Sequence, residues 1–112
     1  MKRSVSVLVF ALAACPQAAL AQQDNLSEQQ RFGRQILAQN CGVCHLPPSL
    51  GAKSYGPPLN KAAANGDNDI MREYILNGTP RMPAFKFQLQ ANEVDAVIAY
   101  VRTVPVPGAP AR

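Results

Sequence analysis

The sequence predicts an all-α domain, because three well-separated segments combine helix-capping residues with apolar side chains spaced for one face of a helix. These segments are residues 27–40, 69–77 and 89–103. The stretches between them are rich in proline and glycine, which end helices and form loops. A chain of 112 residues is expected to form one domain.

The first predicted helix begins at a capping box, with Ser27 as the N-cap and Gln30 reaching back to it. Its apolar positions are Phe32, Ile36 and Leu37. Gly33 costs this helix about 1 kcal/mol relative to alanine, which leaves two interpretations. The glycine is either tolerated without a role, or it lies where another helix approaches too closely for a side chain.

The second helix has an N-cap at residues 67–69 and ends at Gly78. Its apolar stripe consists of Ile70, Met71, Tyr74 and Ile75. The third helix has acidic residues near its start and Arg102 near its end, as the helix dipole favours. Its apolar side consists of Leu89, Val94, Val97, Ile98 and Val101. A short helical segment is also expected at residues 61–64, ended by Asn65-Gly66.

The first 21 residues have the anatomy of a secretory signal peptide. Lys2 and Arg3 precede an apolar run at residues 5–14, and Ala19-Leu20-Ala21 is a small-x-small cleavage site. The run is too short to span a bilayer, so no transmembrane segment is expected. We therefore predict cleavage after Ala21 and export to the periplasm. This leaves a domain at residues 22–104 and a proline-rich C-terminal tail at 105–112.

A second processing site overlaps this leader. Leu12-Ala13-Ala14-Cys15 resembles a bacterial lipoprotein signal, and cleavage there would leave a lipid anchor on Cys15. Pro16 follows that cysteine directly, and the complete site ending at Ala21 lies six residues further on. Release without a lipid anchor is therefore the expected outcome, and the mass of the mature N-terminus distinguishes the two.

The charge of the mature chain is close to balanced. Removing Lys2 and Arg3 from the eleven basic residues leaves nine against seven acidic ones, a net charge of +2. The remaining basic residues form no run and do not alternate with aromatic residues, so we expect no nucleic-acid binding. A mild positive charge is still enough to steer the chain toward an acidic partner surface.

The stretch Cys41-Gly42-Val43-Cys44-His45 carries the most specific chemical signal. Two cysteines three residues apart lie about one helical turn apart, so both thiols can bond to one edge of a porphyrin. Cys-x-x-Cys-His is the attachment sequence for c-type haem, and histidine is a standard axial ligand of haem iron. A zinc site needs four ligands, and a thioredoxin-like dithiol needs a βαβ context. The mature chain offers three soft ligands and no such context, so we expect one covalent haem c per chain.

A proline-rich loop after His45 ends at Gly56-Pro57-Pro58-Leu59. One use for a rigid loop beside a haem is to fix a backbone carbonyl that accepts a hydrogen bond from the ring N–H of His45. That bond would set the tautomer and the orientation of the imidazole. The alternative is a loop that is rigid for stability alone.

Met82 is the candidate for the second axial ligand. It lies between Pro80 and Pro83, which force extended backbone and hold the residue stiffly outside any helix. A thioether sulfur opposite imidazole raises the reduction potential of the iron. The competitor is Met71, but a methionine on an apolar helical stripe is more often core filler.

With these residues taken together, the chain resembles a class I (mitochondrial-like) bacterial c-type cytochrome over about residues 29–104. The matching pieces are residues 33–45, 56–59, 78–85 and the terminal helix to Tyr100-Val101. The resemblance implies a small class I cytochrome c fold, with three to five helices around one covalent haem. It also implies that Gly33 meets Tyr100 where the terminal helices cross, that the Pro57 carbonyl braces His45, and that Met82 ligates the iron.

The resemblance further implies an electron carrier that is not an enzyme, because His45 and Met82 together leave no open position on the iron for a substrate. The expected partners are redox proteins: a periplasmic dehydrogenase as donor and an oxidase or another cytochrome as acceptor. Contacts with them are expected to be small and transient, around Ala84, Phe85 and the proline-rich loop. Mitochondrial members have a lysine-rich docking face, whereas this chain has few lysines.

Two alternatives remain open for the function. The form Arg-Met-Pro-Ala-Phe at residues 81–85 is similar to that of small cytochrome subunits of periplasmic dehydrogenases. The chain would then be a tightly bound subunit of a flavin, quinone-cofactor or molybdenum dehydrogenase instead of a monomer. The other alternative is a haem enzyme or gas sensor with an open sixth site.

Since the mature chain is small, we also expect it to be largely unfolded without haem.

Overall fold

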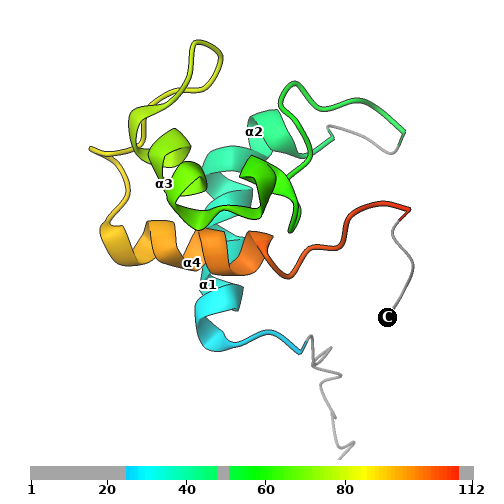
Figure 1. The fold of residues 1–112 in the computed structure, drawn as a ribbon, viewed down its shortest axis with the longest axis horizontal. Coiled ribbons are helices and arrows are strands. Elements are labelled where there is room, and N and C mark those ends of the chain that lie inside the picture. The colour runs from blue at the N-terminus through cyan, green and yellow to red at the C-terminus, as the bar shows by residue number, and fades with distance from the viewer. Residues whose placement is uncertain (1–24, 48–50, 109–112) are drawn as a thin grey trace, which may run out of the picture.

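A computed structural model describes residues 25–47 and 51–108 of the chain. Its helical elements, in order, are α1 (Glu28–Ile36), the π-helical turn η1 (Leu37–Cys41), α2 (Gly42–His45), the 3-10 turn η2 (Ala63–Gly66), α3 (Asn68–Asn77) and α4 (Ala91–Val101). Within the described ranges the only β-type pairing is an isolated bridge between Thr79 and Met82. The predicted small all-α fold is therefore confirmed (Figure 1).

The elements α1, η1 and α2 form one uninterrupted helical run. The capping box is present at its start, where Ser27 N donates to Gln30 Oε1 (2.9 Å) and Gln30 N donates to Ser27 Oγ (3.2 Å). The run ends at His45 instead of near Asn40, so the attachment stretch is itself helical. The reason is Pro47, which keeps Leu46 out of helical backbone and gives it an extended conformation.

The helices α1 and α4 cross in close contact (Figure 1). A Cβ atom at Gly33 would overlap the backbone carbonyl of Ala96, so the predicted close approach of a second helix is confirmed. The nearest atoms to Gly33 belong to Ala96 and Val97, rather than to the ring of Tyr100. Tyr100 is half-buried and lies with Gln30 at a shallow groove beside the crossing. The backbone of α4 at Ala96 and Val97, and not the Tyr100 ring, is therefore the reason that position 33 must be glycine.

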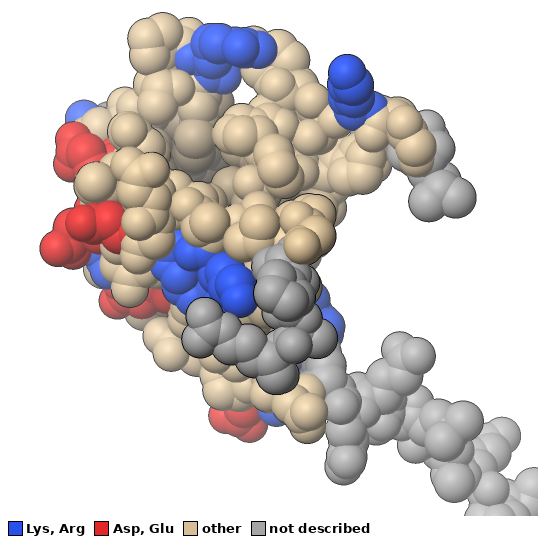
Figure 2. Space-filling model, turned by 45° about the vertical axis from the view of Figure 1, so that its right-hand side comes forward, with Lys and Arg blue, Asp and Glu red and all other residues tan. Residues whose placement is uncertain are grey.

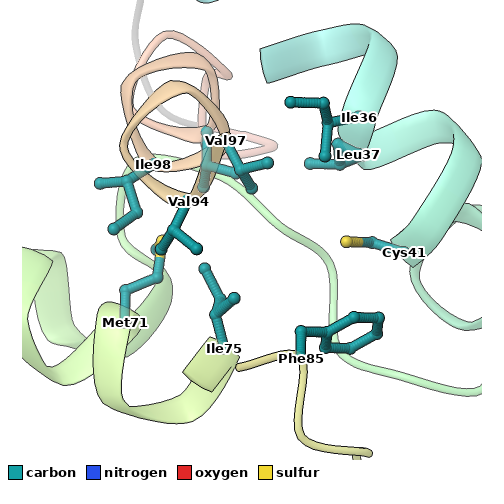
Figure 3. Packing of buried hydrophobic residues seen from close by; sticks show 10 residues of the cluster. Ile36, Leu37, Cys41, Met71, Ile75, Phe85, Val94, Val97 and Ile98 are labelled. Atoms are coloured by element: carbon teal, nitrogen blue, oxygen red, sulfur yellow. The ribbon is translucent and has the colours of Figure 1, made fainter. Parts of the chain in front are cut away.

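A single apolar core joins α4, α3 and the helical run (Figure 3). Its buried side chains are Ile36, Leu37, Cys41, Met71, Ile75, Phe85, Val94, Val97, Ile98 and Val101. The expectation for Phe32 was wrong, because this side chain is 42% exposed. The face of α1 that α4 covers is centred on Gly33 and continues to Ile36 and Leu37, and Phe32 lies to one side of it.

Helix α3 begins and ends as its sequence predicts. The Asp67 side chain caps it by accepting hydrogen bonds from Asp69 N (2.8 Å) and Ile70 N (3.0 Å). Gly78 ends it with a positive φ of 71°. The segment before α3 differs from the expected helix at residues 61–64: it is a 3-10 turn with Ala64 and Asn65 in left-handed backbone.

Helix α4 is shorter than the predicted span of 89–103. It begins after Gln90, whose capping box with Glu93 replaces the expected earlier start. A turn precedes it, closed by the hydrogen bond from Leu89 N to Phe85 O (2.9 Å). None of the helices in the described ranges is long and apolar enough to cross a membrane. The predicted leader at residues 1–21, including Cys15, and the end of the predicted tail lie outside the described residues.

Candidate haem site

A cavity of about 550 Å³ opens between the helical run, α3 and two loops at residues 55–59 and 79–85. Its volume falls in the usual range of small-molecule and cofactor sites. The walls are mainly apolar. Among the described residues that line it, Arg81 is the only Lys or Arg, and there is no Asp or Glu. A bulky apolar group is therefore the kind of ligand that these walls suit.

Both cysteines of the attachment stretch line this cavity. Cys41 is buried in η1 and Cys44 is half-buried in α2, and the two thiols are free. Figure 3 shows the Cys41 sulfur pointing from the helical run toward the space beside Ile75 and Phe85. Burial raises the pKa of the Cys41 thiol, and the nearby Cys44 raises it further. A buried thiol with a raised pKa is a weaker nucleophile than an exposed one.

His45 is the last residue of α2, and its ring is fixed by the proline-rich loop. Its Nδ1 lies 2.7 Å from the carbonyl oxygen of Pro57. Since a carbonyl only accepts, this contact makes Nδ1 the donor and leaves Nε2 as the available ligand atom. The loop is held in turn by Gly56 N, which donates to Cys44 O (2.6 Å). A Cβ at Gly56 would lie 2.8 Å from the imidazole, so the glycine is required for the loop to approach the ring.

Met82 reaches the same cavity from the loop that follows α3. Its backbone forms a tight turn with Thr79, in which each residue's N–H donates to the other's carbonyl (2.9 and 3.1 Å). Its side chain is half-buried. Met71 also lines the cavity, but it is buried in the core on α3. The two methionines thus differ in setting, one in a proline-bounded turn and the other in a helical core.

The alternative of a zinc site finds no support in the described residues. Residues 25–47 and 51–108 contain no group of three or more His, Cys, Asp or Glu side chains that could hold a metal ion. Two thiols and one imidazole on one wall of an apolar cavity fit a covalently attached haem. In that arrangement Cys41 and Cys44 would hold the porphyrin, and His45 would bind the iron.

The structure corrects the predicted position of Phe85. It was expected on an exposed patch, but it is only 8% exposed, whereas Phe87 is 91% exposed. The backbone explains the difference, because Phe85 N donates to Ile75 O (3.0 Å) and ties the residue to α3. With two phenylalanines two residues apart, the sequence alone does not indicate which one enters the core.

Three features of the cavity and its surroundings were not predicted from the sequence. Arg81 stacks over the Tyr55 ring, with its Cζ 4.9 Å from the ring centroid, and so joins the loop of Pro57 to the loop of Met82. Ala63 and Ala64 form part of the wall. Arg102 binds the segment that carries these alanines. The sequence holds no local signal for any of these contacts, since each joins segments far apart in the chain.

The chain matches a protein family described as "Cytochrome C oxidase, cbb3-type, subunit III" over residues 28–101. It is 34% identical over 80 residues to cytochrome c6 of Synechocystis sp., covering 68% of this chain and 66% of that protein. It is 33% identical over 78 residues to cytochrome c6 of Diacronema lutheri, covering 62% of this chain and 88% of that protein. The chain thus spans just under two thirds of the Synechocystis relative.

Two solved structures are similar to this chain. One is the dihydro-heme d1 dehydrogenase NirN in complex with DHE, with a TM-score of 0.55 and 32% identity, covering 71% of this chain and 17% of that one. The other is cytochrome c6 from the diatom Phaeodactylum tricornutum, with a TM-score of 0.49 and 28% identity, covering 64% and 88%. The family match includes the attachment stretch and the three main helices. The chain therefore belongs to the mono-haem c-type cytochromes of the cytochrome c6 and cbb3-type subunit III family, a family of electron carriers.

Proposed function

We propose that this chain is a periplasmic carrier that receives single electrons from a dehydrogenase and delivers them to a respiratory acceptor. The observation that carries the proposal is that His45 and Met82 line the same cavity as Cys41 and Cys44. A bound haem would supply a one-electron ferric–ferrous couple. His45 and Met82 would both bind its iron and leave no open position there, so this arrangement favours electron transfer without substrate binding.

Each residue of the site has a distinct part in this proposal. Cys41 and Cys44 would hold the porphyrin by thioether bonds, which would remove both thiols from redox chemistry. His45 presents Nε2 to the iron, and the hydrogen bond from Nδ1 to Pro57 O holds the ring in one orientation. Met82 supplies a thioether sulfur from a turn that its two flanking prolines stiffen. A rigid pair of ligands keeps reorganisation small when an electron arrives or leaves.

The rim of the cavity supports docking to another protein. Val43 is 88% exposed, and Tyr55, Pro58 and Pro83 beside the cavity are exposed as well. Arg81 adds one positive charge to this apolar rim. In Figure 2 the Asp and Glu side chains gather along one side of the molecule, while Lys and Arg are scattered over the face in view. This distribution suits a small, transient contact with a partner that carries carboxylates around an apolar centre.

A matched pair of methionine variants tests the ligand assignment. Met82→Ala is expected to abolish the weak long-wavelength band that methionine sulfur gives to ferric haem, and to allow carbon monoxide to bind the ferrous form. Met71→Ala removes the other methionine of the cavity and is expected to retain the band. Loss of the band in Met71→Ala with retention in Met82→Ala would reverse the assignment. A wild-type protein that lacks the band and binds carbon monoxide readily would favour the alternative of an open sixth site.

A second candidate function is a permanent electron-transfer subunit of a dehydrogenase. It is favoured by the similarity of 71% of this chain to part of a solved dehydrogenase. Gel filtration of the protein from its native source distinguishes the two functions. Elution at the size of the lone domain supports a free carrier, and co-elution with a larger protein supports a subunit. The mass of the same preparation tests cleavage after Ala21 against a lipid-modified Cys15.

A further inference from the structure

Arg102, the first residue after α4, binds the segment at residues 61–68 with every nitrogen of its guanidinium. Its Nη1 donates to Lys61 O (3.0 Å) and to Ala63 O (2.8 Å). Its Nη2 donates to Asp67 O (2.9 Å), and its Nε donates to Asn68 Oδ1 (2.7 Å). One half-buried side chain thus gathers four acceptors from a segment more than thirty residues away in the chain.

This segment has an unfavourable backbone that needs such support. Ala64 (φ 52°) and Asn65 (φ 56°) are the only non-glycine residues with positive φ in the described ranges. Left-handed backbone costs an alanine free energy, because its Cβ crowds the following carbonyl oxygen. Non-glycine residues keep such a conformation only where surrounding contacts impose it, and these positions cluster at functional sites.

The strained segment forms a wall of the cavity. Ala63 and Ala64 are half-buried and line it directly. The segment includes Asp67, the N-cap of α3, and α3 contributes Met71, Tyr74 and Ile75 to the same wall. Arg102 itself does not line the cavity. Any influence on the haem must therefore pass through the segment that it binds.

We propose that Arg102 is a positioning residue for the haem site: it holds residues 61–68 closed against the cavity and so raises the reduction potential of the haem. This proposal rests on the proposed function. A wall of alanine methyl groups excludes water from one side of the haem, and a dry environment disfavours the more highly charged ferric form. Without the guanidinium, the strained segment would relax outward, admit water and stabilise the ferric form.

The test uses the haem-loaded protein and two substitutions of the arginine. Arg102→Gln removes most of the hydrogen bonds, and Arg102→Lys keeps the charge but not the planar fork that reaches acceptors on three sides. In both variants we expect faster hydrogen exchange of the amides at residues 61–68. At a fixed applied potential we expect about a tenfold lower ferrous-to-ferric ratio, which for one electron is a midpoint lowered by about 59 mV.

Arg72→Gln is the matched control. Arg72 also joins α3 to α4, but its guanidinium pairs with Asp95 instead of with acceptors in residues 61–68, and Arg72 does not line the cavity. We expect its midpoint potential and its exchange at residues 61–68 to match those of the wild type. A midpoint shift in Arg72→Gln as large as that in the Arg102 variants would overturn the proposal, because any loosening of α3 and α4 would then suffice.

Three other outcomes would overturn the role of Arg102. The first is unchanged hydrogen exchange at residues 61–68, and the second is faster exchange there with an unshifted midpoint potential. The third is an Arg102→Lys variant whose exchange and midpoint potential both match those of the wild type. If Arg102→Gln yields no haem-loaded protein, Asn68→Ala removes a single acceptor of the fork, and it must lower the midpoint by a smaller amount. Failure of the proposed function is seen separately, since a wild-type protein without a haem spectrum would refute both proposals before any variant is made.

Discussion

The backbone carbonyl of Ala96 occupies the space in which a side chain at Gly33 would begin. Both residues are buried, and α1 and α4 meet there at backbone distance. The helical run continues from Gly33 directly into Cys41, so the position of α4 also fixes where the attachment stretch lies.

Replacing Gly33 with alanine is expected to destabilise the haem-loaded protein. Forcing a methyl group against a backbone carbonyl costs about 3 kcal/mol, and the better helix propensity of alanine offsets about 1 kcal/mol of that. Chemical unfolding should therefore show a free energy of unfolding lower by about 2 kcal/mol. Gly42→Ala is the control, because its added Cβ would come closest to the flexible side chain of Leu46, at 3.2 Å, and would lie at an ordinary contact distance of 3.8 Å from the backbone oxygen of Leu37. Equal stability of the two variants would contradict the close crossing.

Replacing Gly56 with alanine is expected to disturb the iron ligand without unfolding the domain. The new methyl group would lie 2.8 Å from the His45 ring and push it away from Pro57 O. An imidazole that is held less firmly is displaced from the iron by protonation more readily. In an acid titration, the ferric Soret band should therefore lose its native form at a higher pH than in the wild type. The same pH midpoint in both proteins would show that the hydrogen bond from His45 to Pro57 does not support ligation.

Neutralising Arg81 is expected to slow electron transfer with anionic reagents. Arg81 is the one Lys or Arg among the described residues that line the cavity. In low salt, Arg81→Gln should reduce hexacyanoferrate oxidation of the ferrous protein roughly threefold and leave the rate with a cationic ruthenium complex equal or higher. The difference should fade near 1 M salt, where the screening length is about 3 Å. Lys61→Gln, which does not line the cavity, is the control, and an equal effect there would indicate net charge alone.

Preventing haem attachment is expected to remove the cooperative fold. The double change of Cys41→Ser and Cys44→Ser leaves an apolar cavity of about 550 Å³ in a small domain, and such domains have little stability to spare. Calorimetry of this variant should show no sharp transition. Val43→Ser, a change within the same stretch, keeps both cysteines and should unfold like the wild type. A sharp transition of the haem-free variant near the wild-type temperature would refute this expectation.

Local signals in the sequence predicted the helices well. Ser27, Asp67 and Gly78 act within a few residues of themselves, so their capping roles follow from the sequence. The apolar spacing of α4 likewise matched its buried face, from Val94 to Val101. The ends of the elements were less accurate: the first helix continues through the attachment stretch until Pro47 stops it after His45, and α4 begins only after Gln90.

The long-range contacts could not be predicted from the sequence. The grip of Arg102 on Asp67 and Asn68 spans more than thirty residues, and nothing in its neighbourhood distinguishes it from an ordinary arginine at a helix end. The burial of Phe85 in place of Phe87 likewise depends on a backbone hydrogen bond to α3. The attachment stretch was recognisable because its chemistry requires a fixed spacing.

The wide turn η1, at Leu37–Cys41, separates the two tasks of the helical run. In this turn the Asn40 side chain donates to Ile36 O (3.0 Å), which satisfies a carbonyl at the widened part of the helix. A π turn adds one residue to a helix and so rotates the residues after it by roughly 100° relative to the residues before it. The half before η1 can thus be shaped for its neighbouring helix, while the extra residue sets which side of the half after it faces the cavity. Removing a single residue here would turn both sulfurs away from the cavity while leaving the Gly33 crossing unchanged.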